Sequence, residues 1–432
     1  MFISLIMLSV DLTTLQSVFH THPAHSISLQ ELSVFTKDLP EQQKRLHSSG
    51  QGFLELGDQP ENVQAIQAYV NRHSDKEYFV ILGIGGSMLG PKTIIEALVP
   101  LDLRRKVFCL DNVDPDIIQE VANWLPLEKT LFLVQTKSGT TPETVAQYLF
   151  FQNQLQQARL DIRKHMVFIT DPVSGWLRKI ATELNIDTFA VPQNVGGRFS
   201  VLTPIGLLIA ALLGVDIAAM LAGAKQIVTK QQLEAWQMAT ASFLLAQKEK
   251  TNVVIMPYSS RLKTFSEWCV QLVAESLGKQ FNLDGEEVFA GLTPIPAVGV
   301  ADQHSQLQLF KEGPHDKQII FIQIESHQSL VTIPAEELQN HPSLVYLYKQ
   351  SFNSLMQAEF IGTRQSLIEA GRPNMTITIS QLDAWHLGAL FMFFELYTVF
   401  LAQLWNINAF DQPGVERSKI LTKEILSKKS KI

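Results

Sequence analysis

Short apolar runs alternate with longer helix-like stretches along most of this sequence. Seven such runs occur, at residues 78–84, 106–110, 131–135, 166–170, 253–256, 319–324 and 375–379. A short run that is apolar throughout is typical of a strand buried on both faces of a parallel sheet. Strands that alternate with helices predict an α/β fold, in which helices cover both faces of each sheet.

The strand runs form two sets, and an apolar helix-like stretch after Pro204 separates them. We therefore predict two α/β sandwich domains in tandem, at residues 61–215 and 235–400. Residues 1–60 are expected to form a peripheral N-terminal helical segment, and residues 401–432 a C-terminal helical tail. The length of 432 residues is sufficient for two cores of ordinary domain size.

The apolar share of 46% and the formal charge of −7 indicate a globular protein that does not bind nucleic acid or an anionic membrane through bulk charge. Residues 202–215 and 387–404 are apolar. The first stretch is short and Glu395 interrupts the second, so both are expected to be buried core helices. Cys109 and Cys269 lie in apolar runs, which excludes a disulfide framework and favours a reduced, cytoplasmic protein.

The N-terminal region gives two weaker signals. Residues 1–10 are apolar, but no basic residue precedes them and no cleavage pattern follows, so we expect a docked segment rather than a signal peptide. His20, His22 and His25 flank Pro23 without other ligand types nearby, so an exposed turn is expected there and no metal site.

In an open α/β sheet, ligands bind beyond the carboxyl ends of the strands, so the loops after the apolar runs are candidate sites. The first loop is GIGGS at residues 83–87, where glycines would let backbone N–H groups approach an anion. The third glycine of a dinucleotide-binding G-x-G-x-x-G motif would fall at Met88. Asp111 ends the next strand, as an adenosine-ribose acid would, so dinucleotide binding stays an alternative for this loop.

The loop at residues 136–144 (TKSGTTPET) contains five hydroxyl side chains and one lysine at the start of a helix. Hydroxyl donors and the positive end of a helix dipole together suit the phosphate of a monoester. The alternative is a Ser/Thr-rich N-cap, although capping needs only one such side chain. No Walker motif is present, so ATP is not the expected ligand.

Arg198 follows paired glycines and carries a permanent charge, so it is a candidate for stabilising an oxyanion. Its alternative is an ion pair with a structural carboxylate. Glu275 lies at the edge of an apolar stripe that includes Trp268, on a helix expected from about Thr264. A partly buried carboxylate there suits a general base, and the alternative is a surface pair with Lys279.

Two further segments contain candidate residues. His304 lies in a polar stretch after a turn expected at residues 294–296, and it is a candidate proton shuttle or a structural histidine. Gln412 and Lys419 are seven residues apart, so they would share a helix face if a helix begins directly after Gln412. The alternative is an N-terminal cap followed by a charged surface helix.

Residues 194–208 (NVGGRFSVLTPIGLL) and 410–419 (FDQPGVERSK) are similar to the two signature segments of the glucose-6-phosphate isomerase family, in its shorter bacterial form. The loops at 83–87 and 136–144 resemble that family's sugar-phosphate cradle. The resemblance implies two tandem sugar-isomerase (SIS) sandwich domains, which agrees with the strand pattern. It also implies reversible conversion of glucose 6-phosphate to fructose 6-phosphate through a cis-enediolate.

The resemblance further implies a role for each candidate residue. Glu275 would move a proton between C1 and C2, and Arg198 would steady the enediolate. Lys419 and His304 would assist ring opening, with the histidine supplied by the neighbouring subunit of a homodimer. The substrate-binding residues would be Gly86, Ser87, Thr136, Lys137, Ser138, Thr141, Thr144, Gly197 and Gln412. No metal or redox cofactor is implied.

The sequence departs from the family pattern in three places. Bacterial members often carry an acidic residue at the position of Leu277, and glycine or alanine is usual at the position of Ser418. Residues 316–350 fit the pattern poorly and are interpreted as a lineage-specific insertion.

Two other functions stay open at this point. One is a related isomerase that also accepts mannose 6-phosphate, because epimer choice depends on side-chain placement at C2. The other is a sugar-phosphate-binding regulator without activity. Such a regulator would need the phosphate loop but not the four catalytic candidates together.

Overall fold

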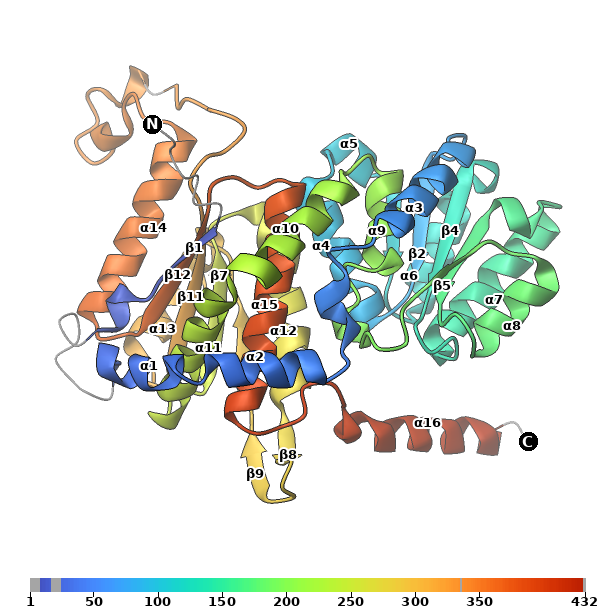
Figure 1. Cartoon of the computed structure of the whole chain (residues 1–432). Helices are drawn as coiled ribbons and strands as arrows, with labels where there is room; N and C mark the ends of the chain where they lie inside the picture. Colours follow the sequence, from blue (N-terminus) through green and yellow to red (C-terminus); the bar gives the residue numbers. More distant parts are fainter. Residues whose placement is uncertain (1–7, 17–24, 335, 430–432) are drawn as a thin grey trace.

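The structure, a computed structural model, describes residues 8–16, 25–334 and 336–429 (Figure 1). It contains two α/β sandwiches, each built on a five-stranded sheet. The predicted α/β class with largely parallel sheets is confirmed.

All strands of the first sheet are parallel, in the order β3-β2-β4-β5-β6. Its strands are β2 (Tyr78–Leu82), β3 (Val107–Leu110), β4 (Thr130–Gln135), β5 (Met166–Thr170) and β6 (Thr188–Ala190). The four strands expected in this half of the chain are confirmed. Sequence patterning does not predict β6, because three residues are too few to show a periodicity.

Alternate side chains of this sheet enter two separate apolar layers. On one face the sheet packs against α6 (Pro115–Trp124), α7 (Pro142–Gln157) and α8 (Trp176–Leu184). On the other face it packs against α3 (Pro60–Arg72), α4 (Leu89–Leu98) and α9 (Pro204–Leu212). Burial on both faces explains why these strands are apolar throughout.

The second sheet has the order β1-β12-β11-β7-β10. Its parallel strands are β7 (Asn252–Pro257), β10 (Thr293–Pro296), β11 (Lys317–Ile324) and β12 (Asn374–Ile379). β1 (Leu8–Asp11) pairs antiparallel with β12, so this sheet is mixed. The three strands expected in this half, β7, β11 and β12, are confirmed.

Both edge strands of the second sheet differ from expectation. The turn prediction at residues 294–296 is wrong, because Pro294 and Pro296 lie in β10. β10 pairs only with β7, and an edge strand tolerates proline because the missing N–H can face away from the ladder. The N-terminal region contributes β1 in addition to its helices α1 (Leu29–Thr36) and α2 (Leu39–Ser48).

The two sheets share one strand order. β10, β7, β11 and β12 occupy in the second sheet the places that β3, β2, β4 and β5 occupy in the first. A helix follows the corresponding strand in each: α4 follows β2, and α12 (Lys263–Leu277) follows β7.

Helices α4 and α12 pack antiparallel between the two sandwiches. The N–H of Thr264, at the start of α12, donates to Glu96 near the end of α4 at 2.8 Å. Gly85, before α4, lies beside Gln271 near the end of α12. The two sandwiches therefore face each other in opposite orientations, so the carboxyl ends of the first sheet's strands lie close to the end of α12.

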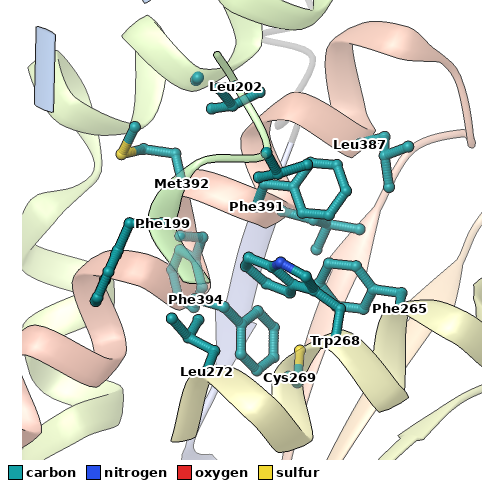
Figure 2. Packing of buried hydrophobic residues seen from close by; sticks show 14 of the residues in the cluster. Phe199, Leu202, Phe265, Trp268, Cys269, Leu272, Leu387, Phe391, Met392 and Phe394 are labelled. Atoms are coloured by element: carbon teal, nitrogen blue, oxygen red, sulfur yellow. The ribbon is translucent and has the colours of Figure 1, made fainter. Parts of the chain in front are cut away.

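The central helix of the second sandwich is α15 (Ala384–Leu404), which packs against α10 (Ile217–Lys230), α11 (Gln232–Gln247) and α12. Figure 2 shows Phe265 and Trp268 of α12 against Phe391 and Phe394 of α15. α15 is the one helix in the described part of the chain that is long and apolar enough to cross a membrane, and 89% of its most apolar window is buried inside the protein. The predictions of buried helices at 202–215 and 387–404 are confirmed by α9 and α15.

Three peripheral features project from this core. A hairpin of β8 (Lys279–Phe281) and β9 (Glu287–Ala290) extends from the end of α12, and α16 (Glu416–Lys429) extends away from the second sandwich (Figure 1). Residues 316–350, interpreted from the sequence as an insertion, include the regular strand β11, and between Ile324 and α14 (Phe352–Glu369) the described residues form two 3-10 turns and an isolated bridge.

Two of the three N-terminal histidines, His20 and His22, lie outside the described residues. The ring of His25 contacts that of His315, with the centroids 4.3 Å apart.

Candidate active site

Two glycine-containing loops meet where the first sandwich faces α12. Gly86, in the turn after β2, lies so close to the turn at Gly197 that a Cβ on it would be 2.3 Å from the Gly197 carbonyl oxygen. Glycine is therefore required at Gly86 by a close backbone approach. Asp111, the acid considered for dinucleotide binding, pairs instead with Lys92 at 2.5 Å.

Arg198 is buried at the junction of three chain segments. Its Nε donates to Ser276 Oγ at 2.7 Å, and its Nη1 donates to Gln412 Oε1 at 2.6 Å. Its Nη2 donates to the carbonyl oxygens of Ala409 and Asp411. The structure thus brings the predicted residues Arg198, Gln412 and Gly197 together, and the four partners fix the orientation of the guanidinium.

Glu275 lies beside this guanidinium, with its Oε1 3.4 Å from Arg198 Nη1. Its Oε2 accepts a hydrogen bond from Gln271 Nε2 at 3.0 Å. The side chain is 25% exposed, while the preceding apolar stripe of α12 is buried. One carboxylate oxygen therefore contacts a cation, the other is held by an amide, and solvent still reaches the group.

The alternative of a surface pair between Glu275 and Lys279 is wrong. Lys279 is buried, and its Nζ donates to the main-chain oxygens of Glu275 and Ser276, each at 2.9 Å. It also lies 3.7 Å from Asp411. Burial lowers the pKa of Lys279 below its usual value. Lys279 therefore caps the C-terminus of α12 and leaves the Glu275 carboxylate to Arg198 and Gln271.

The hydroxyl side chains after β4 form a compact cluster at the start of α7. Thr136 Oγ1 and Thr141 Oγ1 are 2.6 Å apart, and Ser138 Oγ lies 3.3 Å and 3.4 Å from them. No side chain caps the first turn of α7. The N-cap alternative is therefore wrong, because these hydroxyls bond one another and leave the helix N-terminus to another acceptor.

Other expected residues of this loop occupy different environments. Lys137 donates to the carbonyl oxygen of Gln193 at 2.9 Å, and burial lowers its pKa. Thr144 is fully buried in the first turn of α7, where its hydroxyl has no hydrogen-bond partner among the described residues. Ser87 is partly buried directly after Gly86. Gly83 packs against the main chain of Gln135, so the two loops lie at the same edge of the sheet.

Two expected residues lie apart from this cluster. His304 is exposed and follows the carboxyl end of β10, whereas Glu275 precedes the hairpin that leads to the amino end of β10. Lys419 is exposed on α16 and donates to Glu416 at 2.7 Å. The expectation that Gln412 and Lys419 share a helix face is wrong, because α16 begins only at Glu416.

The sequence does not predict four features of this cluster. They are the side chains of Gln271, Ser276 and Asp411, and the capping role of Lys279. Gln271 had a usable signal, since it lies one helical turn before Glu275 on the same face. Ser276 and Asp411 are identified only through their bonds to Arg198, which lies 78 and 213 residues away in the sequence.

Chemically, the site combines a carboxylate, a fixed guanidinium and a hydroxyl-lined helix N-terminus at one edge of a parallel sheet. A carboxylate can transfer a proton, and a neighbouring cation can stabilise the anion that results. A hydroxyl cluster at a helix N-terminus suits an oxyanion ligand. The arrangement fits an acid–base reaction on an anionic substrate.

Comparisons with known proteins agree with this arrangement. The sequence profile of the Phosphoglucose isomerase family matches residues 70–431. A glucose-6-phosphate isomerase of Carboxydothermus hydrogenoformans is 40% identical over 412 residues, which cover 91% of this chain and 89% of that protein. A glucose-6-phosphate isomerase of Thermus thermophilus is 38% identical over 87% of this chain and 90% of its own length.

Solved structures show the same architecture. A hypothetical protein from Thermus thermophilus superimposes with a TM-score of 0.87 at 34% identity, covering 97% of this chain and all of that one. A glucose-6-phosphate isomerase from Chlamydia trachomatis gives a TM-score of 0.74 at 25% identity, over 86% of this chain and 74% of that one. Because the family profile covers most of the sequence and close relatives span nearly all of it, the chain belongs to the phosphoglucose isomerase family.

Proposed function

We propose that the protein interconverts glucose 6-phosphate and fructose 6-phosphate by proton transfer through a cis-enediolate. The observation that carries this proposal is the contact of Glu275 with Arg198 at 3.4 Å, next to the loop at residues 83–87, which in turn packs against the end of β4 before the hydroxyl cluster. A proton α to a sugar carbonyl is weakly acidic, so its removal needs a base and a stabiliser of the resulting oxyanion together. The glycolytic role of this reaction is part of the proposal, as is a cytoplasmic location.

In this proposal Glu275 carries the proton between C1 and C2. Gln271 holds one carboxylate oxygen and Arg198 lies beside the other, so the carboxylate is oriented before substrate arrives. The contact with Arg198 is long compared with the guanidinium's other bonds of 2.6 and 2.7 Å. It is therefore the contact that an enediolate oxygen would most easily replace, and Arg198 would then steady the developing charge.

The hydroxyl cluster is the proposed phosphate site. Thr136, Ser138 and Thr141 would donate to the phosphate oxygens once a ligand replaces the bonds that they make with one another. Lys137 would add a positive charge, and Thr144 a backbone N–H in the first helical turn. Ser87 and Gln412 would contact the sugar between this site and Glu275, next to Gly86 and Gly197. Gripping the distant phosphate orients the sugar without taking part in the proton transfer.

We further propose a homodimer whose subunits share their active sites. His304 and Glu275 of one chain lie toward opposite ends of β10, which favours a histidine supplied by the partner. The hairpin beside the site exposes Phe281, Leu283, Val288 and Phe289. An apolar surface of this kind favours coverage by another chain. Lys419 and His304 would then assist ring opening in the assembled site.

The experiment that tests the proposed reaction is fructose 6-phosphate turnover by the purified protein, coupled to glucose-6-phosphate dehydrogenase. Glu275→Gln is expected to lower kcat by a factor of about 10² to 10⁴ while still binding the substrate. Glu267→Gln, on the same helix but outside the cluster, is the matched control and should keep wild-type kcat. A wild-type protein that binds the sugar phosphate without turnover would indicate the regulator instead.

A further inference from the structure

A cavity lies on the far side of the α4–α12 helix pair from the candidate active site. Its volume is about 700 Å³, within the range of small-molecule sites. The loops that follow β7, β11 and β12 line it, and the end of α4 closes it. Residues of this wall include Ala97 and Leu98 from α4, and Ser259, Arg261, Ser326 and His327 from the loops.

This cavity occupies the place in the second sandwich that the active site occupies in the first. The active site lies where the carboxyl ends of the first sheet's strands meet the end of α12. The cavity lies where the carboxyl ends of the second sheet's strands meet the end of α4. Because the sheets share one strand order and α4 and α12 are antiparallel, the two places correspond. Carboxyl ends of parallel strands are where open α/β sheets bind ligands.

The correspondence extends to individual loops. The hydroxyl cluster follows β4, and its counterpart is the segment after β11, which contains Ser326, His327 and Ser329. The side chains of this segment are exposed. The main chain is fixed, since the N–H of Ser326 donates to the Ser380 carbonyl oxygen at 2.9 Å. Two hydroxyls and an imidazole thus line the cavity without a hydrogen-bond partner among the described residues.

Two acidic side chains and one guanidinium line the cavity. Arg261 donates from Nη1 to the Ala97 carbonyl oxygen at 3.0 Å and has no ion-pair partner in the described chain. The two acidic side chains of the wall are occupied. Asp216 accepts from the N–H of Ala219, and Asp383 accepts from both the N–H and the ring Nδ1 of His386. Each carboxylate therefore faces the positive end of a helix dipole, and Arg261, whose guanidinium has no carboxylate partner in the described chain, is the positively charged group of the wall that can bind an anion.

We propose that this cavity is a second ligand site, which binds the phosphate group of a small phosphorylated metabolite through Arg261, Ser326, His327 and Ser329. The counterpart of Glu275 on α4 is Glu96, which does not line the cavity, because its carboxylate accepts from the N–H of Thr264 at 2.8 Å. Binding there is therefore regulatory and not catalytic. The argument rests on the proposed function, since the role of the segment after β11 is inferred from the phosphate role proposed for residues 136–141.

The test is the number of inorganic phosphate ions that bind per full-length chain, measured by isothermal titration. We expect two for the wild type, one for Arg261→Gln, and one for the double variant Thr136→Ala/Thr141→Ala. Combining all three substitutions should abolish binding. Arg45→Gln, a substitution of an exposed arginine outside the cavity, is the control and should leave two. Arg261→Gln should also keep wild-type kcat.

A second variant keeps the test valid if Arg261→Gln does not fold. Ser326→Ala combined with His327→Gln alters only exposed side chains, and it should likewise lose one phosphate. Two phosphates in both of these variants, or one phosphate in the wild type that only the Thr136/Thr141 substitutions remove, would overturn the second site. One phosphate that is lost with Arg261 but kept by the Thr136/Thr141 variant would instead remove the phosphate role from the active-site loop.

Discussion

The four catalytic candidates of this chain divide between two very different regions. Arg198 and Glu275 lie at a junction of three chain segments, where Arg198 donates to Ser276 and Gln412, and Glu275 accepts from Gln271. His304 and Lys419 are exposed, and neither contacts that junction. The two residues proposed for proton transfer are thus oriented within one chain, whereas the proposed ring-opening groups would have to be brought to them by another element.

The largest effects are expected when one catalytic candidate of each region is substituted. Arg198→Lys replaces a fork of five donors with a single ammonium, so it should lower kcat by about 10² to 10³ and also reduce the melting temperature. His304→Ala should lower kcat as well, but it should leave the melting temperature unchanged because the ring makes no hydrogen bond with a described residue.

Coupled assays and thermal unfolding of both variants would check this difference. Equal loss of stability in the two variants would contradict the division into a fixed and an unfixed region.

A smaller effect is expected from the hydroxyl cluster. Thr141→Ala should raise KM by a factor of about 10 to 150 with little change in kcat, because one hydrogen bond to a charged phosphate contributes about 1.5–3 kcal/mol. Thr229→Ala is the control, since Thr229 is an exposed threonine on α10 outside the loop. Steady-state kinetics with fructose 6-phosphate measure both. An unchanged KM in Thr141→Ala would count against the proposed phosphate site.

Glu395 on α15 contrasts with Glu275, because it is a carboxylate that the proposed reaction does not use. It is fully buried without a hydrogen-bond partner among the described residues, and burial raises its pKa well above 4.5. The folded protein therefore holds it neutral, while the unfolded chain ionises it above about pH 4.5. This contribution to stability is fully present below that pH and is lost as the pH rises toward the folded pKa.

Glu395→Gln should remove this pH dependence, which amounts to about 1.4 kcal/mol per pH unit in that window. Urea unfolding at pH 5 and pH 8 measures it. The variant should gain stability relative to wild type at the higher pH. A constant difference between the two proteins at both pH values would show that Glu395 ionises in the folded state.

A similar division, between locally and distantly determined elements, explains how much of the fold the sequence could predict. The buried central strands and α9, α12 and α15 were accessible, because complete burial leaves a continuous apolar pattern or stripe. β1, β6 and β10 were not, since each is a short edge strand that includes polar residues or prolines. Their places are set by pairing with distant strands.

In the site, residue types in loops were sufficient to select Arg198, Glu275 and the hydroxyl cluster as candidates. Their mutual positions were not predictable, because Arg198 bonds to groups 78 and 214 residues away. The prediction that Gln412 and Lys419 share a helix face is wrong for a local reason. Residues 413–415 form a 3-10 turn, so the α-helix starts too late to include Gln412.

The measurement that most directly tests the shared site is the activity of a mixed dimer. One subunit would carry Glu275→Gln and the other His304→Ala, with different affinity tags so that the heterodimer can be purified after co-expression. If His304 acts in the partner's site, one of the two sites contains both residues intact. The heterodimer should then show about half the wild-type activity, while each homodimer is nearly inactive. A heterodimer as inactive as the two homodimers would contradict the account.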